Sequence, residues 1–142
     1  MSVDPKSLAL TAARAADSKG GTEILVIDVG DVLAICDYFV VVTAANSPQV
    51  KAIVDHIEER TGEELDDKPR AIEGAGGRHW VLMDYGSVVV HVFLAEDRDY
   101  YRIERLYSDS PKVDWAEADQ TVDRIAADRI DADQAYGARQ AD

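Results

Sequence analysis

A pair of short, uninterrupted apolar runs constrains the fold of this chain more than any other feature of its sequence. Residues 24–27 read Ile-Leu-Val-Ile, and residues 38–43 combine aromatic with β-branched side chains. A strand with one face in water alternates apolar and polar residues, whereas a strand covered on both faces is apolar throughout. The two runs therefore predict strands, at residues 23–29 and 38–43, that are buried on both faces of a sheet.

Two segments carry the start signals of helices. Asp4 precedes Pro5, and Asn46 stands two residues before Pro48, so each segment offers an N-cap followed by proline in the first turn. We expect the second helix to end at residues 61–62, where glycine suits the left-handed position that follows a helix. Apolar residues recur on one face of each helix: Leu8, Ala12 and Ala15 in the first, and Val50, Ile53, Val54 and Ile57 in the second.

The second half of the chain predicts a hairpin and a third helix. Residues 80–83 and 88–94 read as strands, and the Asp-Tyr-Gly-Ser segment between them is a turn signal. Helical periodicity returns over residues 97–107, with three residues on one face: Tyr100, Ile103 and Tyr107. This order of elements predicts an α/β domain with a mixed β-sheet and helices packed on it.

The composition changes after residue 113. Residues 114–142 contain eight acidic and three basic side chains, many alanines and few large apolar groups. Such a composition is typical of a solvated segment. We therefore expect one domain over residues 1–113 and an acidic, alanine-rich tail over residues 114–142, of which residues 119–130 could form a short helix.

The charge of the chain limits its partners. With 28 acidic and 15 basic residues, its formal net charge is −13, and no three consecutive Lys or Arg residues occur. A chain this acidic is repelled by nucleic-acid phosphates and by anionic membrane surfaces. We expect no direct nucleic-acid binding and no membrane binding, and we expect partners that are small molecules or proteins with a basic face.

Cysteine content indicates the compartment. Cys36 is the one cysteine, so the chain can form neither an intramolecular disulfide nor a cysteine-based metal site. The first residues lack the basic and apolar regions of a signal peptide, and no apolar run is long enough to span a membrane. These features predict a cytoplasmic protein, with Cys36 as a small buried apolar residue.

Candidate catalytic groups are sparse. The glycine cluster at residues 74–77 leads into a strand, whereas phosphate-binding loops lead into a helix. His91 alternates with valines in a strand, which favours a structural role. Asp28 and Asp31 lie at the end of the first strand, where two carboxylates could hold magnesium, but their spacing points them to different sides of an extended backbone. A magnesium-dependent nucleotidyl- or phosphoryl-transferase that uses these two residues is the alternative interpretation; we otherwise expect no metal and no cofactor.

Aromatic residues gather around the hairpin and the third helix: Trp80, Tyr85, Tyr100, Tyr101 and Tyr107. They are interleaved with Asp, Glu and Arg side chains. Trp80 and Leu82 share one face of their strand, and Val81 and Met83 share the other, so one pair is expected to pack under a helix. Aromatic side chains beyond those that a core needs are typical of protein interfaces.

The same residues resemble the ribosomal silencing factor family, also called Iojap. The resemblance is carried by residues 80–93, followed by Glu96, Arg98, Tyr100, Tyr101 and residues 103–106. Residues 37–41 with Thr43, and Glu73-Gly74, match as well, so the resemblance covers roughly residues 5–112 and leaves the tail outside. Two departures are visible: residues 43–47 contain no glycine-serine pair of the kind usual in the family, and Tyr107 replaces its usual tryptophan.

This resemblance implies a non-enzymatic role. Family members bind the large ribosomal subunit through its ribosomal protein fourteen, block its joining to the small subunit when nutrients are scarce, and tend to form homodimers. Their fold is similar to that of nucleotidyltransferases. This chain, however, lacks the glycine-serine helix start and the D-x-D pair on a strand that those enzymes need.

The leading hypothesis is therefore a translational repressor that sterically blocks subunit joining. An acidic protein of this kind can approach a basic ribosomal protein more easily than ribosomal RNA. Five residues are the predicted contacts with the ribosomal protein: Trp80, Asp84, Tyr85, Tyr100 and Glu104. Besides the transferase alternative, an adaptor whose acidic tail is the working part remains open.

Overall fold

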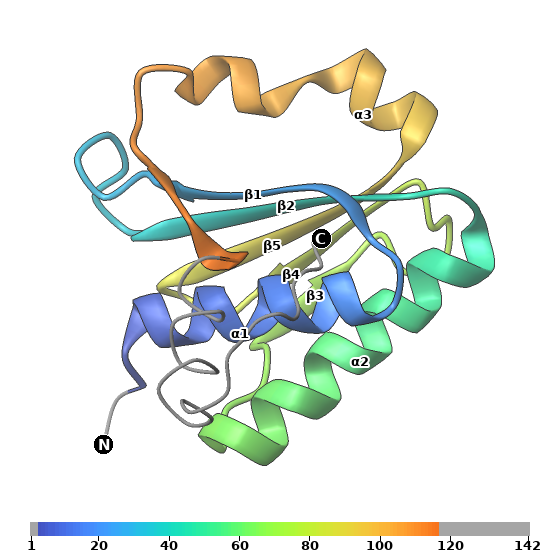
Figure 1. Ribbon diagram of the computed structural model, residues 1–142, viewed down its shortest axis with the longest axis horizontal. Coiled ribbons are helices and arrows are strands. Elements are labelled where there is room, and N and C mark those ends of the chain that lie inside the picture. Colours follow the sequence, from blue (N-terminus) through green and yellow to red (C-terminus); the bar gives the residue numbers. More distant parts are fainter. Residues whose placement is uncertain (1–2, 117–142) are drawn as a thin grey trace, which may run out of the picture.

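The computed structural model describes residues 3–116, which form a mixed sheet with helices on both of its faces (Figure 1). In Figure 1, α1 and α2 lie side by side below the sheet and α3 lies above it. The elements follow the chain as α1 (Pro5–Ser18), β1 (Thr22–Asp28), β2 (Tyr38–Ala44), α2 (Ser47–Leu65), β3 (Ala71–Glu73), β4 (Trp80–Asp84), β5 (Val88–Leu94), α3 (Ala95–Tyr101), the 3₁₀ helix η1 (Ile103–Tyr107) and β6 (Lys112–Val113).

The sheet confirms the predicted fold class. Its strand order over the described residues is β3-β4-β5-β2-β1-β6. The central pair, β2 and β5, runs parallel, and the other neighbouring strands run antiparallel. The two apolar runs, at residues 24–27 and 38–43, lie in β1 and β2, and both contribute buried side chains to each face of the sheet.

Both predicted helix starts are confirmed. The carboxylate of Asp4 accepts a hydrogen bond from the backbone N–H of Ser7, and the side chain of Asn46 accepts one from Gln49. The predicted end of α2 at Gly62 is wrong, because the helix continues to Leu65.

A contact with a residue far along the chain holds the last part of α2 in place. The hydroxyl of Thr61 lies 2.9 Å from the hydroxyl of Tyr85, which follows β4. Thr61 is fully buried there, so this hydrogen bond anchors the last turns of α2 to the hairpin. Asp66, with φ at 53°, takes the left-handed position in place of glycine.

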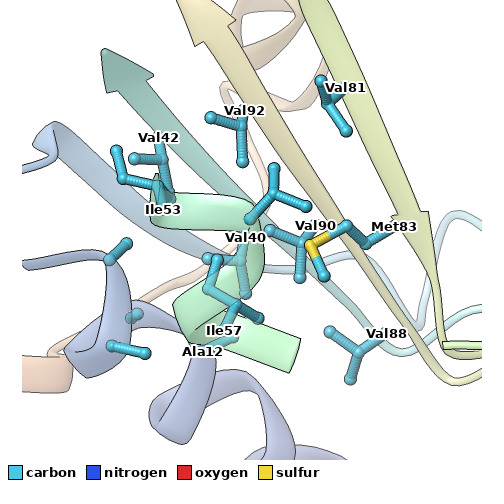
Figure 2. Close-up of a cluster of buried hydrophobic side chains, with 14 of the residues drawn as sticks. Ala12, Val40, Val42, Ile53, Ile57, Val81, Met83, Val88, Val90 and Val92 are labelled. Atoms are coloured by element: carbon cyan, nitrogen blue, oxygen red, sulfur yellow. The ribbon is translucent and has the colours of Figure 1, made fainter. Parts of the chain in front are cut away.

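The larger core lies between the sheet and the pair α1 and α2. Figure 2 shows valines of β2 and β5 pointing towards Ile53 and Ile57 of α2, with Ala12 of α1 beside them. The buried face of α1 consists largely of alanines, which allow the helix to approach closely. The turn after α1 is equally tight, since a Cβ on Gly21 would lie 2.8 Å from Val42.

The opposite face of the sheet is covered by α3 and η1, and here the predicted helix over residues 97–107 is wrong. Helix α3 ends at Tyr101, and Arg102 takes a left-handed conformation with φ at 47° before η1 begins. The break separates side chains that one continuous helix would have placed on the same face. Ile103 and Tyr107 pack against the sheet, whereas Tyr100 is 80% exposed.

Trp115, two residues beyond the predicted boundary at residue 113, packs against the folded domain. The indole N–H of Trp115 donates a hydrogen bond to the backbone oxygen of Ile24 in β1, at 3.3 Å, and its ring packs against the larger core. The helix predicted over residues 119–130 lies outside the described residues. None of the helices within residues 3–116 is long and apolar enough to cross a membrane.

The position of Trp115 generates a prediction about stability. Trp115→Ala removes a half-buried indole and its hydrogen bond, so we expect the free energy of unfolding to fall by about 2 kcal/mol, below the loss for a fully buried tryptophan. Chemical denaturation of the full chain measures the change. Leu106→Ala, at a side chain that is 77% exposed, is the control and should leave stability nearly unchanged. Equal stability of the two variants would show that the domain does end before Trp115.

Candidate protein-docking site

The structure separates the five predicted contact residues. Tyr100 is highly exposed and Trp80 is half-buried, and both lie on the α3 side of the molecule. Tyr85 is only 7% exposed and belongs to the core on the other side of the sheet, where burial raises the pKa of its phenol to about 12. The prediction of Tyr85 as a contact is therefore corrected, because its ring packs in the core and its hydroxyl is hydrogen-bonded to the hydroxyl of Thr61.

Asp84 and Glu104 are placed on the α3 side, but both have structural partners. Asp84 accepts a hydrogen bond from the backbone N–H of Gly86 at 2.7 Å and so closes the turn between β4 and β5. Glu104 accepts one from the Nε atom of Arg98 at 3.2 Å, and its side chain is 19% exposed. These two carboxylates stabilise the surface on which a partner would dock and are less available for direct contact.

A row of aromatic rings in contact connects the buried sheet to the surface; we call it the aromatic row. It runs from Phe93 in β5 to Trp80 in β4 and on to Tyr101 and Tyr100 at the end of α3, with centroid separations of 4.8, 4.8 and 4.9 Å. Phe93 is fully buried, whereas Tyr101 is 49% and Tyr100 is 80% exposed. Such ring pairs gain free energy beyond the area they bury, so the exposed tyrosines stand on a rigid base.

A buried guanidinium holds α3 and η1 on the sheet. Arg98 is 4% exposed, and its Nη1 atom donates to the backbone oxygen of Glu23 at 2.9 Å and to the hydroxyl of Thr43 at 2.8 Å. Its Nε atom donates to Glu104 in η1. Arg98 therefore connects β1, β2, α3 and η1 through one side chain.

The strand β1 is distorted where it meets Arg98. Glu23 has a φ of 49°, and the pairing register with β2 shifts between Thr22 and Leu25. A bulge of this kind turns a backbone group out of the ladder, and the carbonyl of Glu23 is the group that accepts from Arg98. The hydroxyl of Thr43 donates in turn to the Glu23 carboxylate at 3.2 Å, which completes the network.

His91 confirms its predicted structural placement within β5. It is 5% exposed, and its Nδ1 atom accepts a hydrogen bond from the indole N–H of Trp80 at 3.2 Å. Burial lowers the pKa of this imidazole to about 4, because the charged form would lose its hydration. At neutral pH the ring is therefore uncharged.

The residues considered for other chemistry do not assemble into a site. Asp28 accepts a hydrogen bond from the backbone N–H of Gly30 at 3.1 Å, and Asp31 is exposed. Within residues 3–116, no three His, Cys, Asp or Glu side chains lie close enough together to hold a metal ion. Cys36 is buried, as predicted, and burial raises the pKa of its thiol.

Sequence reasoning missed the parts of the surface that depend on long-range contacts. Tyr101 was counted among the aromatic residues but not among the contacts, although it joins Trp80 to Tyr100. Arg98 was treated only as part of the family pattern. A single arginine between a predicted sheet and a predicted helix gives no local sign of burial, and only the acidic Glu104 six residues later hints at its partner.

The fold and this surface define an α/β protein with exposed aromatic rings on one side of its sheet, and comparisons with known proteins show its family. A family model described as "Ribosomal silencing factor during starvation" matches residues 2–141. The chain is 36% identical over 112 residues to the ribosomal silencing factor RsfS of Bacillus subtilis, which covers 79% of this chain and 94% of that protein. The chain belongs to the ribosomal silencing factor family.

A solved structure and a more distant relative extend the comparison. A crystal structure of a protein from Chromobacterium violaceum has a TM-score of 0.71 and 30% identity, and the match covers 80% of this chain and 93% of that one. A mouse protein named "Mitochondrial assembly of ribosomal large subunit protein 1" is 28% identical over 122 residues, which is 81% of this chain and 49% of that protein.

The Arg98 network predicts a large loss of stability. Arg98→Ala leaves Glu104 and the turned-out carbonyl of Glu23 without their donor, and removing one partner of a buried ion pair typically costs about 3–5 kcal/mol. Chemical denaturation measures the loss. Arg105→Ala, at an exposed position in η1, should change stability by less than about 0.5 kcal/mol. Similar losses in the two variants would contradict the anchoring role of Arg98.

The lowered pKa of His91 predicts a dependence of stability on pH. The unfolded chain binds a proton near the ordinary histidine pKa of 6.5, whereas the folded chain binds it only near pH 4. The contribution of His91 is therefore complete above pH 6.5, falls as the pH drops towards 4, and amounts to roughly 3 kcal/mol over that window. The stability difference between the wild type and His91→Gln, measured by denaturation between pH 7 and pH 4, should shift against the wild type by this amount. A constant difference across the window would contradict a neutral buried histidine.

Proposed function

We propose that this protein is a cytoplasmic translational repressor that binds the large ribosomal subunit through its ribosomal protein fourteen. In this role it sterically blocks the joining of the large and small subunits and slows translation when nutrients are limited. Membership of the ribosomal silencing factor family supports the proposal. The names of the relatives describe a regulatory role in silencing, and the name of the mouse relative includes the large subunit.

The observation that carries the proposal is the exposed end of the aromatic row. Tyr100 and Tyr101 expose large ring surfaces on a segment that Arg98 fixes to the sheet. Tyrosine, tryptophan and arginine supply most of the binding energy at protein interfaces. A tyrosine pair that is held rigid before binding loses little conformational entropy on docking.

The charge of the chain favours a protein surface over RNA. The net charge of −13 disfavours close approach to ribosomal RNA, which is a dense array of phosphates. A basic ribosomal protein offers the complementary charge and accelerates the encounter at long range. The large subunit is thus approached through one of its proteins.

To block subunit joining, the protein has only to occupy a surface of the large subunit; it does not have to catalyse a reaction. A domain that covers surface required by the small subunit prevents joining for as long as it stays bound. The homodimer that the family resemblance implies would cover the same exposed tyrosines in the free protein, if it forms through this face. No observation favours the transferase alternative with Asp28 and Asp31.

Sedimentation with purified large ribosomal subunits tests the proposal. The full chain should migrate with large subunits and reduce the fraction of joined ribosomes. The double variant Tyr100→Ala/Tyr101→Ala should bind about 30-fold more weakly, which corresponds to about 2 kcal/mol, the loss expected at an interface hot spot.

The control for this experiment is a second pair of exposed apolar residues. Val32→Ala/Ile35→Ala changes side chains that are 62% and 89% exposed in the loop between β1 and β2, away from the aromatic row. This variant should bind like the wild type. A wild-type chain that stays at the top of the gradient would overturn the proposal. If the two double variants weaken binding equally, the aromatic row is not the surface that binds the large subunit.

A further inference from the structure

The inside of the docking face contains a histidine whose hydrogen bonding is incomplete. His91 lies in the middle of β5, directly opposite Leu82 of β4 in the strand register. Its imidazole is buried among three other rings, with centroids at 4.7, 6.1 and 6.3 Å: Phe39, Trp80 and Phe93. A hydrocarbon side chain could fill the same space, so the polar atoms of this residue call for a separate explanation.

One of the two ring nitrogens has a partner that fixes the protonation of both. The indole N–H of Trp80 can only donate, so the Nδ1 atom of His91 must accept the 3.2 Å hydrogen bond between them. In the neutral ring the hydrogen then lies on Nε2. The lowered pKa of His91 keeps the ring in this neutral form at pH 7.

The Nε2–H group is left without an acceptor. This atom is buried, and among residues 3–116 no oxygen, nitrogen or sulfur atom accepts a hydrogen bond from it. The ring of Phe39, in an edge-on arrangement at 66°, is at most a weak substitute for an oxygen. Buried donors in native proteins nearly always find a partner, so a donor without one marks a place where another molecule can supply it.

The location of the unpaired donor connects it to docking. Trp80 and Leu82, its neighbours on β4, are both half-buried, so this part of the sheet face is incompletely covered by α3 and η1. The half-exposed ring of Tyr101 contacts Trp80 in a tilted arrangement at the same face. Nε2 itself is buried in the free chain, so a hydrogen bond to a partner requires a neighbouring side chain outside the aromatic row to move on docking.

We propose that the Nε2–H group of His91 is a binding donor, which hydrogen-bonds to a carbonyl or hydroxyl oxygen of the protein that docks on the aromatic row. This inference rests on the proposed function, since it needs a protein on this face. An uncharged oxygen is the fitting acceptor, because the carboxylates of Asp84 and Glu104 on the same side of the sheet would repel an anion. The hydrogen bond would make His91 a determinant of which protein surface is accepted.

Two amide substitutions separate the two ring nitrogens. The amide of glutamine reaches the position of Nε2 and keeps a donor there, whereas the shorter side chain of asparagine reaches only the position of Nδ1 and can accept from Trp80. With purified large ribosomal subunits as the binding partner, His91→Asn should bind about tenfold more weakly than the wild type, which corresponds to about 1.4 kcal/mol. His91→Gln should stay within about threefold.

A control variant and the binding of the wild type make the outcome decisive. Tyr85→Phe removes a buried hydrogen bond on the other side of the sheet and should bind like the wild type. If the wild type binds and His91→Asn binds equally well, or if both amide variants weaken equally, the donor role of His91 is overturned while the proposed function stands. If the wild type itself does not bind, both the donor role of His91 and the proposed function are contradicted.

Nuclear magnetic resonance on the wild type keeps the test independent of variants that fold poorly. In the full chain with ¹⁵N-labelled histidine, Nδ1 of His91 should carry no proton and Nε2 should carry one. Addition of isolated ribosomal protein fourteen should shift the Nε2 proton to lower field, as a new hydrogen bond requires. An Nε2 proton that stays unshifted while other residues of the aromatic row respond would overturn the inference.

Discussion

The buried guanidinium of Arg98 is the interaction on which the α3 side of this molecule depends. It links α3 to the backbone of β1, to the hydroxyl of Thr43 in β2 and to Glu104 in η1. A buried charge without partners costs several kcal/mol, so the segment that carries Arg98 has one favourable position on the sheet. The bulge at Glu23 turns a carbonyl towards this charge. With α3 held in this way, Tyr100 and Tyr101 are presented at a fixed place instead of on a loosely attached helix.

The two faces of the sheet therefore differ in what stabilises them. Towards α1 and α2 the core is aliphatic, with valines of β2 and β5 packed against isoleucines of α2 (Figure 2). Towards α3 the face contains the aromatic row, the neutral His91 and the Arg98 network. The first face supplies most of the buried apolar area and hence most of the folding free energy. The second face combines rigid aromatic rings with a few buried polar groups, and this combination suits recognition of another protein.

Features of the fold with local causes could be predicted from the sequence. The caps at Asp4 and Asn46 and the apolar runs of β1 and β2 depend on neighbouring residues, and the structure confirms them. The position of α3 on the sheet could not be predicted, because it depends on hydrogen bonds from Arg98 to Glu23 and Thr43, which lie 75 and 55 residues earlier in the chain. The hydrogen bond that holds Thr61 near the end of α2 likewise comes from a distant residue, Tyr85. In the candidate site, the sequence indicated the aromatic character, but exposure depends on tertiary packing, and so buried Tyr85 and exposed Tyr100 looked alike.

We propose that this protein docks on the large ribosomal subunit with the α3 side of its sheet. A cryo-electron microscopy structure of the full chain bound to purified large subunits would test this placement. In that structure we expect Tyr100 and Tyr101 to lie against ribosomal protein fourteen, with α1 and α2 facing away from that protein. A complex in which α1 and α2 form the contact, or in which the chain rests mainly on ribosomal RNA, would contradict it.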